Sequence, residues 1–252
     1  MIVDRDAEDL IAAAAAAPVD GWGFGWLAGR ATEERPPWGY ARLVADRMTY
    51  ADAALDVDTG GGEVLAEVPS APKLLAATEA WPPNVEVARR TLRRIGASVV
   101  AVAPDGPLPF RDASFDLVVS RHPVRTDWVQ TARVLRPGGT FLSQQIGAGT
   151  MRELSEAMLG PLPPPTQRHP EHAAAAAEAA GLRVVDLRRA TLRATFADIG
   201  AVVWFLRKVV WTVPGFTVED YRAPLHALHH RIAREGPFVA HAQRFLIEAT
   251  RP

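Results

Sequence analysis

The sequence of 252 residues contains no cysteine, which excludes disulfide bonds, thiolate metal sites and cysteine nucleophiles. It also lacks an excess of either charge. The formal net charge is −1, so no overall attraction to nucleic acid or to a membrane surface is expected. No apolar run approaches the roughly 18 residues of a membrane-spanning helix, and the first residues are acidic where a secretion signal would be basic. We therefore expect a cytoplasmic protein with neither nucleic acid nor membrane as a partner.

The chain is long enough, at 48% hydrophobic residues, to bury a full core. Short apolar runs alternate with helical patterns through residue 146, which predicts an α/β fold with an open, mostly parallel sheet and helices on both faces. A first strand is expected to end near residue 57, and others to span 73–78, 98–103, 115–120, 140–146, 182–189 and 245–249. Helices are expected at 4–17, 41–50, 63–67, 82–95, 126–135, 149–159, 170–180 and 218–234, with residues 136–139 as a closing turn.

One stretch has the pattern of a buried strand that ends in a glycine-rich turn. Asp56 closes the apolar run, and Asp58, Gly60, Gly61 and Gly62 follow it. Glycine is needed where the backbone takes a positive φ or lies against a ligand, and a helix that starts after such a turn presents free N–H groups. This pattern alone is compatible with many ligands.

The next strand is expected to end at a second acid, Glu79, one β-α-β unit after Asp56. A carboxylate at this position can accept hydrogen bonds from both hydroxyls of a ribose, although a strand-end acid can also be merely solvated. A nicotinamide-dinucleotide fold would allow the same spacing. Its fingerprint, however, requires glycine or alanine three residues after Gly62, where Leu65 stands.

Two further motifs follow in the chain, LPFRDASFDLVVS at 108–120 and RVLRPGGTFL at 133–142. Together with LDVDTGGGE at 55–63 and the strand-end acid, they make residues 50–147 resemble the class I S-adenosylmethionine-dependent methyltransferases. The resemblance is to the small bacterial group with the patterns "LPF…FD" and "RVLRPGG". The segment at 198–216 is also similar to an insertion that precedes the final strand in members of this family.

This resemblance implies a doubly wound, Rossmann-like sheet of the seven-stranded methyltransferase type. It implies one domain over 1–252, with a helical lid at 1–50, a cofactor-binding core at 51–147 and the C-terminal half of the sheet at 148–252. A cap at about 191–235 is then inserted before the last strand.

The resemblance also implies a site for S-adenosylmethionine, made of Asp56, Asp58, Gly60, Gly62, Glu79, Ala80, Asp105 and Ser120. Glu79 matches the acid that binds the ribose. Asp58 stands where the family has its third glycine, and its charge would either suit the sulfonium or amino group or weaken binding. Pro104 stands where the family often has an acid that meets the adenine amino group, and Asp105 follows it.

Two residues at the end of the fourth strand, Arg121 and His122, are the candidates for a role in the reaction. Methyl transfer is an in-line displacement, and a base is needed only if the acceptor must lose a proton. His122 has the intrinsic pKa of such a base, although a single histidine in a loop can equally be exposed or structural.

Aromatic residues gather at 22–40 and 191–235, where they either pack onto the core or form the walls of a substrate pocket. Their apolar bias favours a small, partly hydrophobic acceptor. His226 and His230 share a helix face, but no third ligand completes a metal site, so none is expected.

The sequence therefore predicts a methyltransferase, monomeric or homodimeric, that acts on a small molecule with S-adenosylmethionine as the methyl donor. The alternative is a methyltransferase-like binding protein that has lost turnover, for which Asp58 and the missing adenine acid at Pro104 are the motivation.

Overall fold

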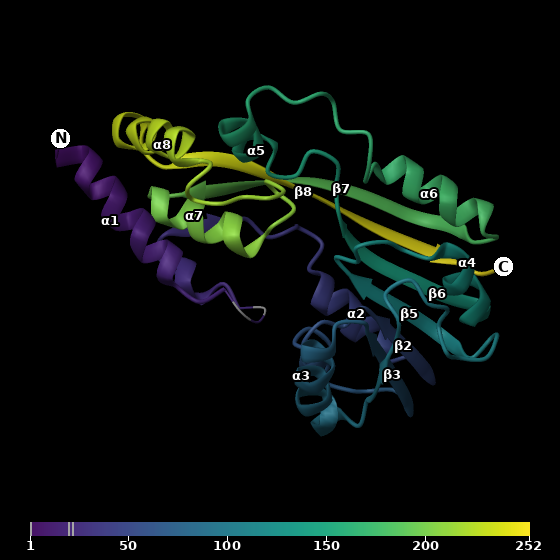
Figure 1. Cartoon of the computed structure of the whole chain (residues 1–252). Coiled ribbons are helices and arrows are strands. Elements are labelled where there is room, and N and C mark those ends of the chain that lie inside the picture. Colours follow the sequence, from purple (N-terminus) through teal and green to yellow (C-terminus); the bar gives the residue numbers. More distant parts are fainter. Residues whose placement is uncertain (1, 20, 22) are drawn as a thin grey trace. The chain divides into compact units, whose positions relative to one another are not determined.

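The computed structural model describes residues 2–19, 21 and 23–252, and the chain forms two compact units (Figure 1). Unit 1 comprises Met1–Arg35, Gly149–Pro165 and Thr191–Gln243. Unit 2 comprises Pro36–Ala148, Thr166–Ala190 and Arg244–Pro252. We describe each unit by itself.

The strands follow the order β1-β7-β8-β6-β5-β2-β3-β4. Neighbours are parallel from β6 through β4, whereas β8 is antiparallel to β6 and β1 is antiparallel to β7. The bounds are β1 Ala31–Glu33, β2 Ala53–Val57, β3 Leu74–Glu79, β4 Ser98–Ala101, β5 Phe115–Arg121, β6 Leu135–Ile146, β7 Arg183–Phe196 and β8 Phe238–Thr250. The predicted α/β class with a mostly parallel sheet is confirmed, with eight strands where the resemblance implied seven.

The helices are α1 Ile2–Ala16, α2 Tyr40–Met48, α3 Pro82–Leu92, α4 Trp128–Val134, α5 Arg152–Leu159, α6 Pro170–Ala179, α7 Ile199–Lys208 and α8 Arg222–Glu235. Short 3₁₀ turns lie at Gly25–Leu27, Leu65–Glu67 and Arg93–Ile95. For two of these helices, the residue at the start explains why the helix begins there. Pro82 opens α3, where its missing N–H has no partner to lose, and Asp127 caps α4 by accepting a hydrogen bond from Gln130 N at 3.0 Å.

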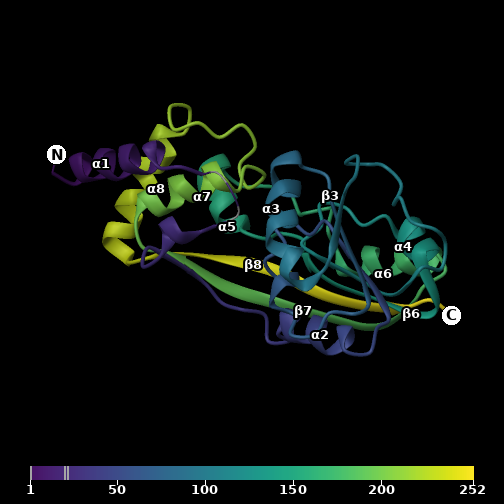
Figure 2. The same cartoon turned by 90° about the horizontal axis from the view of Figure 1, so that it is seen from below.

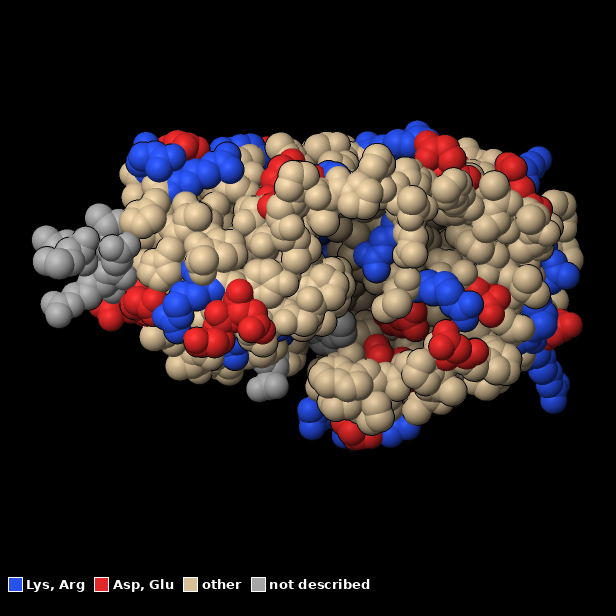
Figure 3. All heavy atoms as spheres, turned by 45° about the horizontal axis from the view of Figure 1, so that its top comes forward, with Lys and Arg blue, Asp and Glu red and all other residues tan. Residues whose placement is uncertain are grey.

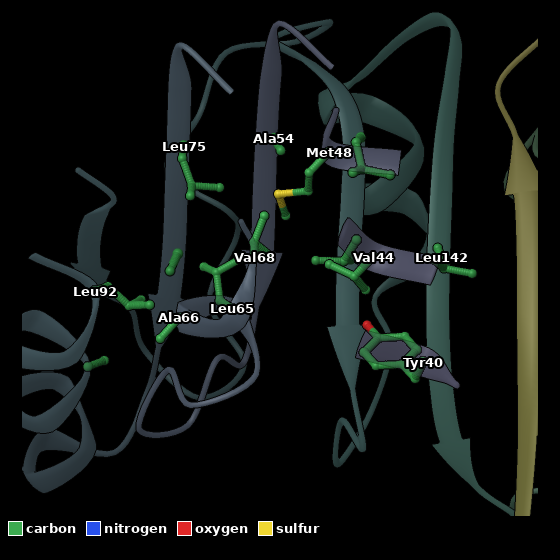
Figure 4. Packing of buried hydrophobic residues seen from close by; sticks show 14 of the residues in the cluster. Tyr40, Val44, Met48, Ala54, Leu65, Ala66, Val68, Leu75, Leu92 and Leu142 are labelled. Atoms are coloured by element: carbon green, nitrogen blue, oxygen red, sulfur yellow. The ribbon is translucent and has the colours of Figure 1, made fainter. Parts of the chain in front are cut away.

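Both faces of the unit 2 sheet carry a hydrophobic core. On one face, α2, α3 and the Leu65–Glu67 turn pack against β2, β3 and β5, and Figure 4 shows Tyr40, Val44 and Met48 of α2 directed at these strands (Figure 4). On the other face, α4 and α6 supply Val134 and Ala177, and the two helices lie side by side in both ribbon views (Figure 2). This double covering is why β2 and β5 read as continuous apolar runs in the sequence.

The RPGG motif at 136–139 lies within the first residues of β6, where the pairing with β5 is irregular, and is not a turn that closes the preceding helix. Asp116 Oδ2 accepts a hydrogen bond from Ala53 N at 2.9 Å, and its Oδ1 accepts one from Arg136 Nη1 at 2.7 Å. A Cβ on Gly139 would lie 2.9 Å from the carbonyl oxygen of Arg136, so a larger residue does not fit there. Asp116, the aspartate of "FD", and the RPGG segment therefore join β2, β5 and β6 through hydrogen bonds.

Arg133, also from this motif, fixes the LPF segment. Its guanidinium donates to the carbonyl oxygens of Leu108 at 2.8 Å and Phe110 at 2.7 Å, and to Asp112 Oδ1 at 2.8 Å. The two motifs that carried the resemblance thus meet through hydrogen bonds. Their shared role is to hold together the amino-terminal ends of β2, β5 and β6 and the segment that precedes β5.

Several boundaries differ from those expected. Strand β1 was not predicted because three residues are too short for a period to show, and β7 continues to Phe196 across a polar stretch that has no apolar run. The first residues of the expected cap at 191–235 therefore belong to this strand. The expected helix at 63–67 is only the 3₁₀ turn Leu65–Glu67.

In unit 1, α1 packs against α7. A Cβ on Gly200 would lie 2.9 Å from the carbonyl oxygen of Leu10, so glycine permits the close approach of the two helices. Arg207 Nη1 donates to the carbonyl oxygens of Ala14 at 2.6 Å and Ala17 at 2.8 Å. Among the described residues, no helix has both the length and the apolar character needed to cross a membrane.

The aromatic segment at 22–40 is divided between the units. Trp22 lies outside the described residues. Trp26 stacks on Trp204 of α7 with ring centroids 5.8 Å apart in unit 1, whereas Trp38 and Tyr40 are buried in the α2 face of unit 2. The side chains of Trp26, Trp38 and Tyr40 are therefore used in packing within their own units.

Gly62 is the point where the glycine loop rests on α3. Its φ is +81°, and a Cβ on it would lie 2.7 Å from Leu92 Cγ, a fully buried side chain. We expect Gly62→Ala to lower the free energy of unfolding by about 2–4 kcal/mol, since it combines backbone strain with overpacking. Gly96→Ala is the matched control, because Gly96 has φ +72° but no atom within 4 Å of the added Cβ. It should cost only about 1–2 kcal/mol in urea unfolding, and equal losses for the two variants would contradict the packing argument.

Candidate functional site

The glycine loop leaves β2 with a series of unusual backbone angles. Asp58, Gly60 and Gly62 have φ values of 57°, 63° and 81°. Thr59 N donates to the carbonyl oxygen of Thr78 at 2.9 Å, and the Thr59 hydroxyl donates to Asp56 Oδ2 at 2.7 Å. The loop is thus tied to the ends of both β2 and β3, and the non-glycine Asp58 is held in the left-handed region.

Glu79 organises this loop from the end of β3. Its Oε2 accepts a hydrogen bond from Gly60 N at 2.8 Å, and its Oε1 accepts two, from Ala80 N at 2.9 Å and Trp81 N at 2.8 Å. The side chain is 7% exposed, so the three donors replace most of its lost hydration. Glu79 is therefore not a merely solvated acid, and Oε2 keeps a lone pair for a ligand.

Three carboxylates meet here without a counter-ion. Burial first, then the neighbouring Asp58 and Glu79, raises the pKa of Asp56 from 3.8 to about 7, although its hydrogen bond from Thr59 acts in the opposite direction. Burial and Glu79 raise the pKa of Asp58 as well. In the described parts of the chain, no lysine, arginine or histidine forms an ion pair with any of the three. The cluster has unused capacity for a positive charge.

Tyr40 of α2 connects this cluster to β5. Its hydroxyl donates to the carbonyl oxygen of Ser120 at 2.9 Å, and burial together with nearby Asp56 raises the pKa of the phenol, which keeps it neutral. Ser120 pairs in register with Val57 of β2. The Ser120 hydroxyl is buried, and within the described chain it has no hydrogen-bond partner.

Beyond β5, a chain of side-chain hydrogen bonds reaches His122. Trp38 Nε1 donates to Gln144 Oε1 at 2.7 Å, and Gln144 Nε2 lies 2.9 Å from His122 Nε2. An indole N–H can only donate, so Gln144 must present its oxygen to Trp38 and its NH₂ to His122. His122 Nε2 is therefore the acceptor, and the ring is neutral with its proton on Nδ1.

The electrostatics of His122 agree with this assignment. Burial, followed by the charges of Arg121 and Arg244, lowers the pKa of His122 from 6.5 to about 3. Protonation would also place two N–H donors against each other at Nε2. At neutral pH the ring is thus uncharged, and its Nε2 lone pair is occupied.

The structure brings most of the predicted residues together. Asp56, Asp58, Gly60, Gly62, Glu79 and Ala80 form one connected cluster at the carboxyl ends of β2 and β3, where open α/β sheets bind their ligands. Ser120, Arg121 and His122 follow on β5, the neighbouring strand. Asp105 is exposed, and its recorded partner is Arg125, whose Nη2 lies 3.1 Å from Asp105 Oδ1.

Sequence reasoning missed the residues that hold this site in shape: Trp38, Tyr40, Thr59, Thr78 and Gln144. Thr59 adjoins the glycines and could have been found from that position. The sequence gives no indication that Trp38 and Gln144 bond to each other, because 106 residues separate them.

One histidine of α8, His226, has an acidic neighbour on another helix. His226 Nε2 lies 2.8 Å from Glu8 Oε1 of α1, inside unit 1. Within the described chain, no group of three or more His, Cys, Asp or Glu side chains has an arrangement that suits a metal ion.

Comparison with known proteins yields one family. Residues 55–143 match the model of a family described as a methyltransferase domain, and this range contains the glycine loop, Glu79 and β5. A search of curated protein sequences finds no match.

Solved structures share the fold. A putative methyltransferase from Bacillus halodurans C-125 has a TM-score of 0.60 at 17% identity, over 84% of this chain and 98% of that one. The YcgJ protein from Bacillus subtilis has a TM-score of 0.58 at 18% identity, over 84% and 97%. A geranyl diphosphate methyltransferase in complex with S-adenosylmethionine has a TM-score of 0.51 at 14% identity, over 84% of each chain.

The raised pKa of Asp56 gives a pH-dependent stability. Between the carboxyl pKa of the unfolded chain, about 4, and that of the folded protein, about 7, only the folded state holds the proton, so stability falls as the pH rises through this window. We expect Asp56→Asn to raise the free energy of unfolding at pH 8 by roughly 2–4 kcal/mol, and much less at pH 5. Urea unfolding at both pH values measures this.

Asp105→Asn is the matched control for that experiment. Asp105 is exposed and its ion pair lies in solvent, so removing its charge should not stabilise the protein at pH 8. A gain for Asp56→Asn that did not depend on pH would contradict the burial argument.

The tautomer of His122 is directly measurable. We expect ¹⁵N chemical shifts of the imidazole to show the Nδ1–H form and no titration between pH 5 and pH 8. Gln144→Glu should reverse this: a carboxylate accepts from both Trp38 and His122, so the proton moves to Nε2 and the pKa of His122 rises. Gln145→Glu changes the next residue, whose side chain bonds Thr126 instead, and should leave the tautomer unchanged. An Nε2–H form in the unaltered protein would contradict the network.

Proposed function

We propose that this chain, in which residues 55–143 match a methyltransferase domain, is a class I S-adenosylmethionine-dependent methyltransferase that transfers a methyl group to a small, partly hydrophobic acceptor. The observation that carries the choice of cofactor is the cluster of Asp56, Asp58 and Glu79. Three carboxylates at the carboxyl ends of β2 and β3, with no cation paired to them in the described chain, suit a ligand with a sulfonium and an ammonium group.

The residues of unit 2 fit this cofactor in chemistry. Gly60 and Gly62 leave the loop without side chains where a ligand must approach the backbone. Glu79 keeps acceptor capacity on Oε2 for a ribose hydroxyl, and Asp58 adds negative charge beside it. When bound, S-adenosylmethionine supplies a methyl group that its sulfonium activates for displacement.

The protein's own contribution to such a reaction is positioning. An in-line displacement is accelerated when the two reacting atoms are held collinear in a site from which water is excluded. His122 has its Nε2 lone pair occupied by Gln144, so we do not assign it the role of a general base. Its Nδ1–H is available as a donor, and Arg121 beside it supplies a charge.

The face of the molecule in Figure 3 gives no reason to prefer a polymer as the acceptor. Basic and acidic side chains are interspersed on it, and neither sign forms an extended stripe (Figure 3). A nucleic-acid surface would gather Lys and Arg along one path. We therefore retain a small molecule as the acceptor, with the cytoplasm as the place of action and a monomer or homodimer as the active form.

The competing function is a binding protein of the same fold that has lost turnover. Asp58 is the feature that motivates it, because a charged side chain replaces a glycine of the family pattern. Its backbone is held at φ 57°, and Asp58 N donates to Thr78 Oγ1 at 3.4 Å. We propose instead that the Asp58 carboxylate serves the cofactor's positive charge.

Calorimetric titration tests the cofactor. We expect S-adenosylmethionine to bind at micromolar concentration and more tightly than S-adenosylhomocysteine, which lacks the positive sulfonium. Glu79→Ala should weaken both ligands by at least about tenfold, since it removes the acceptor that also orders Gly60. Glu67→Ala, on the exposed side of the adjacent turn, is the matched control and should bind as the unaltered protein does.

The Asp58 carboxylate is tested in the same titration. Asp58→Asn keeps a residue that tolerates the left-handed backbone but removes the charge. We expect it to lower the affinity for S-adenosylmethionine more than that for S-adenosylhomocysteine. A large gain in affinity would favour the binding protein, and no binding of either ligand to the unaltered protein would refute the proposed activity.

A further inference from the structure

A cavity of about 240 Å³ lies in unit 2, on the α4–α6 side of the sheet. It begins directly after His122 in the chain, where the segment at 123–126 leaves β5. Arg125, Thr126 and Trp128 line it from this side, Gln145 from β6, Phe245 from β8, and Arg168 from the segment before α6. Nothing in the cofactor site described above accounts for it.

The charged groups of this cavity all have one sign. Two arginines line it and no aspartate or glutamate does. Arg168 has no carboxylate partner among the described residues, and Arg125 makes a single solvent-exposed bond, to Asp105. The nearest acid on α6, Glu171, is already paired with Arg189. The cavity therefore has guanidinium donors left for an anion.

Arg168 is also held in a conformation that a non-glycine residue rarely adopts. Its φ is 62°, and its carbonyl oxygen accepts a hydrogen bond from Ala148 N at 3.0 Å. A bulky side chain in the left-handed region costs about 1–2 kcal/mol, so the surrounding structure fixes the backbone there. An arginine that lines a cavity in this conformation, with no carboxylate partner in the described chain, points to a ligand rather than to stability.

The rest of the lining is amphipathic. Trp128 and Phe245 supply aromatic walls, while the amide of Gln145 donates to the Thr126 hydroxyl at 3.0 Å and leaves its carbonyl oxygen free of any recorded partner. Drug-sized ligands occupy pockets of about 300–1,000 Å³, so a volume of about 240 Å³ suits a smaller molecule.

The cavity stands beside the proposed cofactor site in the sheet order. Asp56 ends β2, β5 is its neighbour, and β6 follows β5. The lining residues 123–126 and 145–146 lie at the carboxyl ends of β5 and β6, at the same edge of the sheet as the glycine loop. A molecule in the cavity is thus placed one strand away from the residues assigned to the cofactor.

We propose that this cavity binds the anionic group, a carboxylate or a phosphate, of a small aromatic or apolar acceptor. The assignment of the bound molecule as the methyl acceptor rests on the proposed function. Arg168 is the main anion-binding residue and is specificity-determining, because its planar guanidinium matches either anion with two parallel hydrogen bonds. Arg125 assists it, and the aromatic walls select an apolar body.

The test uses probes of matched shape, without any cofactor. Purified protein is titrated with benzoate, phenyl phosphate and neutral benzamide in a low-salt buffer, and binding is followed by calorimetry and by the indole N–H resonance of Trp128. We expect at least one anion to bind about tenfold more tightly than benzamide. Which of the two binds better distinguishes a carboxylate from a phosphate ligand.

Variants assign the effect to the cavity. Arg168→Gln should reduce anion affinity by about tenfold or more, and Arg125→Gln by less because Arg125 already pairs with Asp105. Arg168→Lys should recover part of the loss, since it restores the charge without the planar fork. Arg90→Gln is the matched control: Arg90 is exposed on α3, does not line the cavity, and should leave binding unchanged.

The outcomes separate this inference from the proposed function. Equal binding of benzamide and the anions, or an unaffected Arg168→Gln variant, would overturn the anion site even if S-adenosylmethionine binds. Anion binding that depends on Arg168 in a protein that binds neither S-adenosylmethionine nor S-adenosylhomocysteine would support the site, yet overturn its assignment to a methyl acceptor.

Discussion

The carboxylate of Glu79 is the interaction on which the candidate site depends. It is buried at the end of β3 and accepts hydrogen bonds from Gly60 N in the loop and from Ala80 N and Trp81 N at the start of α3. A buried charge is tolerated only when such donors replace its hydration. One side chain therefore fixes the glycine loop, the strand end and the entry to α3 relative to one another, all within unit 2. Asp56 and Asp58 are then brought beside it by the loop, and their raised pKa values follow from that placement.

This arrangement opposes stability. Asp56 and Asp58 are placed beside Glu79 with no ion-pair partner in the described chain, and folding alone would favour replacing at least one of the three acids. Hydrogen bonds at the opposite, amino-terminal ends of the strands stabilise the sheet without touching the site: Asp116 joins β2 to the RPGG segment, and Arg133 fixes the LPF segment. The recognisable family motifs are thus largely structural, whereas the acids next to the glycines are the part whose cost points to a ligand of opposite charge.

Features that depend on residues close together in the sequence were predictable, and those that depend on residues far apart were not. The strands of the parallel sheet and the meeting of Asp56 with Glu79 were predictable, because buried strands are apolar runs and their carboxyl ends share an edge. The continuation of β7 to Phe196 was not, since half-exposed residues carry no apolar run. The contact between Trp38 and Gln144 has no local signature in the sequence. The tautomer of His122, which depends on that contact, was therefore not predictable. Arg168 stands between the helices expected at 149–159 and 170–180, where the sequence predicts no element, and only the fold places it with Trp128 and Phe245 in the lining of one cavity.

The hydrogen bonds at His122 and the cavity beside it constrain the chemistry together. His122, which directly follows β5, has its Nε2 lone pair occupied by the Gln144 amide and is uncharged at neutral pH, so it is poorly suited to take a proton in the proposed reaction. Reactivity then depends on the acceptor's own ionisation and on how it is held. An acceptor whose nucleophilic atom already has a free lone pair needs no base, and a fixed anionic group supplies the orientation that an in-line displacement requires. In the proposed anion site, Arg168 supplies that orientation without the need for a second titratable group.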